Sequence, residues 1–334
     1  MRKTLSSAKY HTHHGAQALR PMNATRFLPS SRTVRAFAKI NLTLDVFSKR
    51  ADGYHSMASV MQVISLHDTL TLSRREQPGI GFTCDAPAAA EIPADATNLV
   101  YRAAQSALTA AEAGGWSMEG GVDLHLMKRI PAQAGLGGGS SDAAAALLGM
   151  NALLNLQLPG ATLHDCAAAL GSDVPFFLMG GTATARGRGE NLNALPDAPP
   201  CWLVVVKPEE SVPTGWAYDQ LDAIPDRASH RATGRLEQAL KADDRDRLLA
   251  FQSNDFELPV FTHFPRLAWL HDELMMAGAL TAHLCGSGAA LYGVVPDAAV
   301  AQKVATRLEG RYPYVAVARS LNRAESDPLE GKSL

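Results

Sequence analysis

Cysteine is scarce in this chain of 334 residues, which contains only four. Cys84, Cys166, Cys201 and Cys285 are separated by 82, 35 and 84 positions, so no CxxC pair is present. This spacing does not match a zinc site or a dithiol redox motif. We therefore expect four free thiols, as in proteins of a reducing compartment.

Long hydrophobic runs are also missing. The most apolar segment, residues 176–179, is far shorter than the ~20 residues that a membrane-spanning helix needs. Hydrophobic residues make up 46% of the chain and charged residues 19%, which is typical of a folded globular protein and excludes a disordered or fibrous one. The length allows two domains, or one large domain, with an ample core.

Acidic residues are absent from the first 44 positions, which hold eight Lys or Arg. Because residues 1–33 also lack apolar periodicity, we expect a disordered basic leader there. Its composition fits an inert extension of a cytoplasmic protein, an organelle-targeting peptide, or a translation start assigned upstream of Met22. From Asp45 onward 23 basic residues face 33 acidic ones, so we expect no nucleic-acid partner.

Hydrophobic periodicity divides the first half of the chain into strands and helices. Residues 34–46 alternate apolar and polar side chains, which predicts a half-buried strand. Asp52-Gly53 is a turn signal. Further along, the pattern predicts one or two strands at 60–72, a helix at 98–113, a strand at 122–130, and a helix at 140–154 with Ser140, Ser141 and Asp142 available as caps.

A second region follows the proline-rich residues 196–200, which suit a linker. There the pattern predicts strands at 202–206, 290–295 and 314–318, and helices at 235–251, 265–277 and 297–309. Strands and helices mix without strict alternation, which favours an α+β fold with two domains. We expect domain boundaries of 34–198 and 199–322, with a flexible tail at 323–334.

The most informative segment is PAQAGLGGGSSDA, residues 131–143, between a predicted strand and a predicted helix. Its glycines allow backbone N–H groups to surround phosphate oxygens at a helix N-terminus. No Gly-Lys-Ser/Thr follows, so it is not a Walker A loop, and Ser140 occupies the last glycine position of a dinucleotide fingerprint. A flexible glycine linker is the alternative, but the flanking elements disfavour it.

Four weaker signals accompany this loop. Asp173 precedes an apolar run in GSDVPFF, where an ordinary turn or cap aspartate is the simpler interpretation. CGSGAALYG, residues 285–293, is a Gly-Ser loop that alone indicates a tight turn. Lys39 and Asn41 share one strand face, and Tyr54 and His55 follow the Asp52-Gly53 turn. Each signal taken alone favours a structural role.

Taken in order, AFAKINLTLDV, DGYH, PAQAGLGGGSSDAAAAL, LGSDVPFF and CGSGAALYGVV resemble the GHMP kinases over about residues 34–320. The resemblance implies two α+β domains with ATP and a small-molecule substrate in the interdomain cleft. DGYH and GSDVPFF are most similar to members that phosphorylate the 2-hydroxyl of a cytidine diphosphate-linked methylerythritol in non-mevalonate isoprenoid synthesis. Gln133, where the family usually has a small residue, and Cys285, where it has Ser or Thr, depart from the pattern.

The resemblance also implies roles for particular residues. Lys39 and Asp173 would form the catalytic pair, and Ser141 would contact Mg²⁺ on the ATP phosphates. The expected substrate contacts are Asn41, Tyr54, His55, Tyr218 and Gly286. The expected ATP contacts are Asn98, Pro131, Ala132, Gln133, Ala134, Gly135, Leu136, Gly137, Gly138, Gly139, Ser140 and Ser141.

Two other classes stay open at this stage. One is another GHMP enzyme, such as a homoserine kinase or a diphosphomevalonate decarboxylase. Such an enzyme would share the glycine loop but would have no need of Tyr54-His55. A catalytically silent nucleotide-binding regulator would bind ATP and release no ADP, although the presence of Lys39 and Asp173 disfavours it. We expect no membrane partner, and the sequence leaves the oligomeric state open.

Overall fold

The computed structural model describes residues 29–86, 92–224 and 231–329. Most of the expected leader, residues 1–28, lies outside the described residues. Strand β1 begins at Ser31, three positions before the predicted start. Within the described part, no helix combines the length and the apolar character that crossing a membrane requires.

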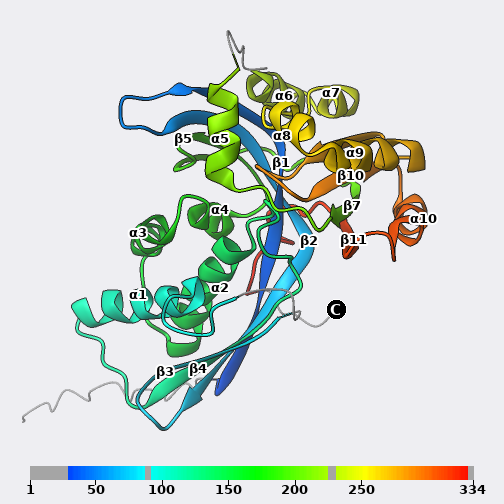
Figure 1. Ribbon diagram of the computed structural model, residues 1–334. Coiled ribbons are helices and arrows are strands. Elements are labelled where there is room, and N and C mark those ends of the chain that lie inside the picture. The colour runs from blue at the N-terminus through cyan, green and yellow to red at the C-terminus, as the bar shows by residue number, and fades with distance from the viewer. Residues whose placement is uncertain (1–28, 87–91, 225–230, 330–334) are drawn as a thin grey trace, which may run out of the picture.

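The sheet of the N-terminal half contains two long antiparallel strands (Figure 1). They are β1 (Ser31–Lys49) and β2 (His55–Arg75), joined by a turn in which Gly53 has φ of +83°. The predicted turn at Asp52-Gly53 is thus confirmed. The sheet order is β3-β4-β2-β1-β8, and β5 pairs with β2 and β6. The remaining bounds are β3 (Gly79–Asp85), β4 (Gly121–Met127), β5 (Thr182–Gly187), β6 (Asn191–Ala194) and β8 (Ser253–Asn254).

Four helices gather on one side of this sheet (Figure 1). They are α1 (Leu99–Ala113), α2 (Gly138–Leu154), α3 (Gly160–Leu170) and α4 (Val174–Met179). Helix α2 is the most central, and its alanines pack against β1, β2 and α1 to form one hydrophobic cluster. Alanine side chains are small, so helix and sheet can pack closely together.

The start of α2 corrects the prediction for its caps. The helix begins at Gly138, and its N-cap is Gly137 in the left-handed conformation without a side-chain cap. Ser140, Ser141 and Asp142 therefore lie within the helix and do not cap it. The backbone enters the helix two residues earlier than predicted because a glycine with positive φ makes the turn.

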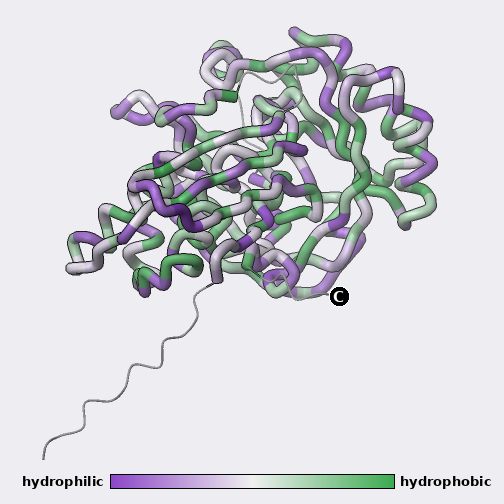
Figure 2. The backbone as a smooth tube through the Cα atoms, turned by 90° about the horizontal axis from the view of Figure 1, so that it is seen from below, coloured by the Kyte–Doolittle hydropathy of each residue, from purple (hydrophilic) through white to green (hydrophobic). Residues whose placement is uncertain are grey.

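A four-stranded antiparallel sheet, ordered β11-β7-β10-β9, forms the C-terminal half. Helices α9 and α10 pack against this sheet, and buried side chains of both form a second hydrophobic cluster. The hydrophobic strands of the sheet run together on the right of Figure 2. The strands are β7 (Trp202–Lys207), β9 (Thr281–Leu284), β10 (Leu291–Val295) and β11 (Tyr314–Arg319). The helices are α5 (Thr214–Asp222), α6 (Ala232–Lys241), α7 (Arg245–Ala250), α8 (Glu257–His263), α9 (Pro265–Ala277) and α10 (Ala298–Leu308).

The prediction of a single helix at 235–251 is wrong, because this segment forms two helices, α6 and α7. Asp243 between them has φ of +51°, which ends α6. Asp244 then caps α7 by accepting a hydrogen bond from the Arg247 N–H.

The two halves are joined by more than the linker at 196–200. Strand β8, from the C-terminal half, pairs in parallel with Thr43 and Leu44 of β1. The buried Asp45 carboxylate of β1 accepts both the Ala232 and Thr233 N–H groups at the start of α6, each at 3.0 Å. A third hydrophobic cluster contains side chains from both sheets.

Residues 323–329 are ordered, which corrects the expected tail for this part of it. The Arg323 guanidinium donates to the carbonyl oxygens of Met179, Gly180 and Thr182 at 2.8–2.9 Å. Ser326 is buried against Gly181. The chain end therefore packs on the N-terminal half.

Candidate active site

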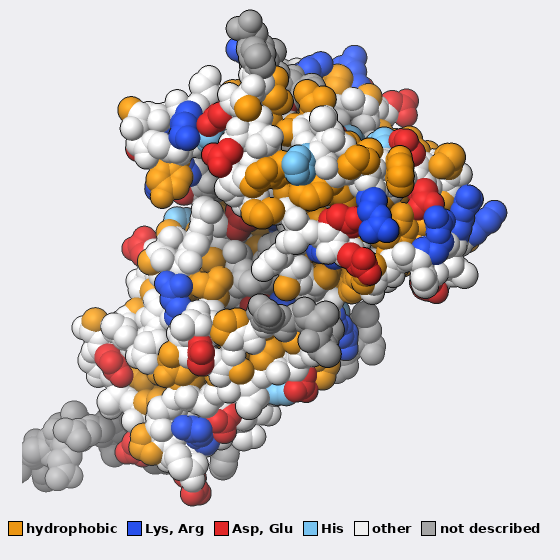
Figure 3. All heavy atoms as spheres, viewed as in Figure 1, with side chains coloured by type: hydrophobic (Ala, Val, Ile, Leu, Met, Phe, Trp, Pro, Cys, Tyr) orange, Lys and Arg blue, Asp and Glu red, His pale blue; other side chains and the backbone are white. Residues whose placement is uncertain are grey.

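A cavity of about 440 Å³ lies between the start of α1 and the glycine loop. It is lined by Ile92, Pro93, Thr97, Asn98, Leu99, Lys128, Pro131, Ala132, Gln133, Ala134, Gly135, Leu136, Gly137, Gly138, Gly139, Ser140 and Asp142. Every residue expected to contact ATP except Ser141 is among them. Figure 3 shows the molecule as two lobes with a hollowed surface between them.

The glycine loop needs its glycines because other backbone segments crowd it. Gly135 and Gly137 have φ of +76° and +72°. A Cβ atom on Gly135 would lie 1.8 Å from the Cys285 carbonyl oxygen, and one on Gly137 would lie 2.7 Å from Cζ of Phe177. The Leu136 carbonyl accepts a hydrogen bond from the Lys39 N–H at 3.0 Å. The loop is thus held between β1, α4 and the 285–288 turn.

Gln133, the first departure from the family pattern, has φ of +51° and a side chain that accepts a hydrogen bond from Ser211 Oγ at 3.1 Å. Glutamine therefore links the loop to the C-terminal half. Cys285, the second departure, is fully buried, and burial raises the pKa of its thiol to about 12. It acts as a small apolar side chain.

Lys39 and Asn41 are joined directly. Lys39 Nζ donates to Asn41 Oδ1 at 2.7 Å, and Asn41 Nδ2 donates to Ser59 Oγ at 2.8 Å. Both side chains are buried. A Cβ atom on Gly286 would lie 3.7 Å from Lys39 Nζ, so the ammonium group sits where the glycine loop meets the 285–288 turn.

Asp173 precedes the short helix α4, but its side chain makes no cap hydrogen bond. Burial, and after it the charge of the Asp173 carboxylate, raises the pKa of Tyr218. Between the described residues Lys39 and Asp173 no ion pair forms within 4.0 Å; the ammonium binds Asn41 instead. The two expected catalytic groups are therefore not paired with each other in this structure.

Two of the five residues expected to bind substrate, His55 and Tyr218, form an aromatic group with Phe256. His55 and Tyr218 stack with ring centroids 4.8 Å apart, and Tyr218 packs edge-on against Phe256. His55 Nε2 lies 2.7 Å from Asp222 Oδ1, and this hydrogen bond is the main reason that the pKa of Asp222 is lowered. Tyr54 is 58% exposed. Tyr218 therefore covers one face of His55, whereas the Arg188 guanidinium lies over the exposed Tyr54 ring, with its Cζ 5.1 Å from the ring centroid.

The structure also shows the surroundings of Asn98 and Ser141, two residues expected to contact ATP. Asn98 caps α1, because its Oδ1 accepts the Val100 N–H at 2.9 Å. Ser141 is 2% exposed and lies with Phe37 and Phe177 around a small internal void, whereas Ser140 lines the large cavity. Of the two serines, only Ser140 lines the large cavity.

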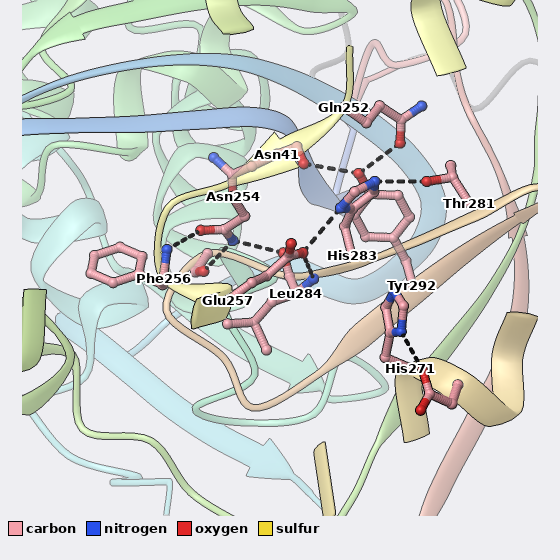
Figure 4. Close-up of polar contacts among 12 residues, drawn as sticks. Asn41, Gln252, Asn254, Phe256, Glu257, His271, Thr281, His283, Leu284 and Tyr292 are labelled. Atoms are coloured by element: carbon pink, nitrogen blue, oxygen red, sulfur yellow. Dashed lines mark hydrogen bonds and ion pairs between the residues drawn. The ribbon is translucent and has the colours of Figure 1, made fainter. Parts of the chain in front are cut away.

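A polar network behind the site was not predicted from the sequence (Figure 4). Asn254 Nδ2 donates to the carbonyl oxygens of Leu284 and Gly286 at 2.9 and 2.7 Å. Glu257 Oε1 accepts the Leu284 N–H at 3.0 Å, and Tyr292 Oη lies 3.0 Å from the Asn41 carbonyl oxygen. These contacts fix both the 285–288 turn and the strand that carries Lys39. They join residues far apart in the chain, so no local motif marks them.

Comparison with known proteins decides the family. Models of the GHMP kinase N-terminal and C-terminal domains match residues 98–181 and 236–313. A 4-diphosphocytidyl-2-C-methyl-D-erythritol kinase of Moorella thermoacetica is 42% identical over 294 residues, covering 86% of this chain and 99% of that protein. The chain belongs to the GHMP kinase family. It is accordingly a small-molecule kinase that uses ATP.

Further similarities of this GHMP kinase support the same family and fold. The Geobacter sulfurreducens 4-diphosphocytidyl-2-C-methyl-D-erythritol kinase is 36% identical over 289 residues, which is 86% of this chain and 99% of that one. A crystal structure of a 4-(cytidine 5'-diphospho)-2C-methyl-D-erythritol kinase superposes with a TM-score of 0.72 at 34% identity, covering 86% of this chain and 98% of that one. A homoserine kinase from Cytophaga hutchinsonii, at 20% identity and a TM-score of 0.69, covering 90% of this chain and 97% of that one, shares the fold.

Proposed function

We propose that this GHMP kinase transfers the γ-phosphoryl group of ATP to the 2-hydroxyl of 4-diphosphocytidyl-2-C-methyl-D-erythritol, giving the 2-phosphate and ADP in non-mevalonate isoprenoid synthesis. The 42% identity to a kinase of that name, over nearly its whole length, carries the proposal. The aromatic group of His55, Tyr218 and Phe256 supports it, because a cytidine base needs a flat surface and a polar edge.

We propose that the triphosphate lies along the glycine loop. The backbone N–H groups there and the N-terminus of the 17-residue helix α2 form an anion site without a P-loop lysine. Asn98 and Leu99 at the opposite wall of the cavity leave room for the nucleoside. The N-terminal half would thus supply the nucleotide site.

Lys39 and Asp173 are the proposed catalytic pair. Phosphoryl transfer depends on placing the hydroxyl in line with the γ-phosphorus and on neutralising the developing charge. Lys39, held by Asn41, provides a fixed positive charge at the edge of the loop. Asp173 orients the substrate hydroxyl and accepts its proton.

We also propose that Mg²⁺ accompanies ATP. This ion prefers hard oxygen donors and usually keeps several waters while bridging substrate phosphates, so it needs few protein ligands. The Ser140 hydroxyl at the cavity wall and the Asp173 carboxylate are donors of that kind. Ser140 is better exposed than Ser141 for this contact. When bound, the ion neutralises phosphate charge.

His55 would then read the base. Its Nε2 is engaged by Asp222, which leaves Nδ1 for the polar edge of cytosine. Tyr54 would provide the flat surface on the open side, while Tyr218 supports the histidine from behind.

The test is an ADP-release assay on the full chain with three acceptors: 4-diphosphocytidyl-2-C-methyl-D-erythritol, homoserine and mevalonate. We expect turnover only with the first. Turnover with homoserine instead would assign the protein to another branch of the family. ATP binding without ADP release from any acceptor would identify a regulator.

A further inference from the structure

Arg188 lies in the turn between β5 and β6, beside residues proposed to bind the substrate base. Strand β5 pairs with β2 so that Gly187 is opposite Met57. The chain that follows Gly187 therefore runs past the start of β2, next to Tyr54. The Arg188 guanidinium lies over the Tyr54 ring, with Cζ 5.1 Å from the ring centroid. A positive charge is thus placed directly beside the proposed base site.

The same turn also reaches the proposed catalytic carboxylate. Gly189, the next residue in the chain, is buried. A Cβ atom on Gly189 would lie 3.7 Å from Ser172 Cβ and 3.9 Å from Asp173 Oδ1. One turn therefore contacts both ends of the proposed substrate site, Tyr54 at the base and Asp173 at the reacting hydroxyl.

The charge of Arg188 is not balanced by a neighbouring acid. Across residues 29–86, 92–224 and 231–329, no carboxylate oxygen lies within 4.0 Å of its guanidinium nitrogens. The basic residues of the β1–β2 hairpin and of β5 differ in this respect, because each forms an ion pair: Lys49 with Asp222, Arg50 with Asp52, and Arg186 with Glu237. The Arg188 guanidinium is therefore available to an anionic ligand.

The proposed acceptor carries such an anion between its two ends. Its diphosphate joins the cytidine to the methylerythritol, so with the base at Tyr54 and the hydroxyl at Asp173 the diphosphate spans the distance between them. A guanidinium group binds phosphate oxygens through paired N–H donors, and its plane can stack on an aromatic ring at the same time. The position and the chemistry of Arg188 both fit the diphosphate.

We propose that Arg188 is a specificity-determining residue whose guanidinium binds the diphosphate of the acceptor. The inference rests on the proposed function and adds the group that recognises the link between base and sugar alcohol. The diphosphate does not change during phosphoryl transfer, so this contact is equally strong before and in the transition state. It therefore acts on KM for the acceptor and leaves kcat nearly unchanged.

The test compares CDP, which has the diphosphate, with cytidine, which lacks it. Their dissociation constants are measured by calorimetry on the full chain, with a saturating non-hydrolysable ATP analogue to keep both ligands out of the nucleotide site. Arg188→Met keeps an unbranched side chain beside the Tyr54 ring but removes the charge. It should weaken CDP binding on the order of tenfold and leave cytidine binding unchanged. Arg188→Lys, which keeps the charge, should recover part of the CDP affinity.

Arg186→Met is the matched control. Arg186 lies two positions away and its side chain is 46% exposed, but it is paired with Glu237, so both affinities should stay at the wild-type values. With the complete acceptor, Arg188→Met should raise KM on the order of tenfold with little change in kcat.

Two results would overturn the proposal. Unchanged CDP affinity in Arg188→Met would show that the guanidinium does not contact the diphosphate. Equal losses for CDP and cytidine would show that Arg188 only supports the Tyr54 ring. A wild-type protein that binds neither ligand would instead refute the proposed function itself.

Discussion

The carbonyl oxygen of Cys285 approaches Gly135 so closely that a Cβ atom there would lie 1.8 Å from it. At this contact the 285–288 turn of the C-terminal half packs directly against the glycine loop of the N-terminal half. An alanine at position 135 must therefore push the two segments apart.

We expect Gly135→Ala to weaken ATP binding at least ~10-fold, because the loop can no longer close on the phosphates. The matched control is Gly310→Ala, since both glycines have φ of +76° but Gly310 has no atom within 4 Å of the added methyl. The control should lose about 1 kcal/mol of folding stability, with ATP affinity unchanged. Equal ATP affinities for the two variants, measured by calorimetry, would contradict this reading of the contact.

Lys39 and Asp173 should affect turnover far more than binding, because their proposed roles concern the transition state. Asp173→Asn should lower kcat on the order of 10²- to 10⁴-fold, and Lys39→Met should be comparably damaging. Asn41→Ala, which removes the acceptor of the Lys39 ammonium and the donor to Ser59 but keeps the positive charge of Lys39, should cost less than Lys39→Met. Steady-state kinetics with both substrates varied will separate kcat from KM. An Asp173→Asn enzyme with near-normal kcat would refute the proposed pair.

Base recognition by His55 predicts discrimination between cytidine and uridine substrates. Uracil has donors where cytosine has acceptors, and the reverse, along its polar edge, so at least one buried partner in the protein would lose its hydrogen bond. This loss costs ~2 kcal/mol, which lowers kcat/KM for the uridine substrate ~30-fold. Asp222→Ala should reduce this discrimination, because it frees the His55 ring from its 2.7 Å hydrogen bond, and KM for ATP should stay unchanged. Equal use of both substrates by the wild type would rule out His55 as the reader of the base.

Burial first, and then the charge of Asp68, raise the pKa of Asp142 to about 8 against the opposing effect of Lys128, and this shift predicts how stability changes with pH. The folded protein holds this proton up to about pH 8, whereas the unfolded chain releases it near pH 4, as an ordinary aspartate does. The stabilisation is therefore complete at low pH and is lost as pH rises through 8. Relative to Asp142→Asn, the wild type should lose Tm between pH 6 and pH 9 in thermal melts. Melting curves that stay parallel across this range would show that Asp142 is ionised throughout.

Local patterns predicted much of the fold. The alternation in β1, the turn at Asp52-Gly53 and the helix at Pro265–Ala277 were predicted correctly, because each depends on neighbours in the chain. Helix α4 was not predicted, since six residues show too little periodicity. The break at Asp243 was also missed, because apolar spacing continues across it.

In the site, too, features within one segment could be predicted from sequence, whereas features formed by distant segments could not. The glycine loop is recognisable from sequence because its function lies in its own backbone. Asn254 and the ion pairs of Lys128 with Asp68 and Asp142 depend on contacts between distant segments, such as Asn254 with the Gly286 carbonyl, 32 residues apart. The only local signal for these ion pairs was a lysine, Lys128, at the end of a strand just before the loop.

The two-residue strand β8 has a consequence for how the molecule unfolds. Together with the bonds from Asp45 to α6, it makes the C-terminal half part of the N-terminal sheet. The interdomain hydrophobic cluster adds to this shared structure. Chains cut at residue 199 would expose the β1 edge and leave the buried Asp45 carboxylate without its donors. The protein should therefore melt as one cooperative unit, with equal calorimetric and van't Hoff enthalpies.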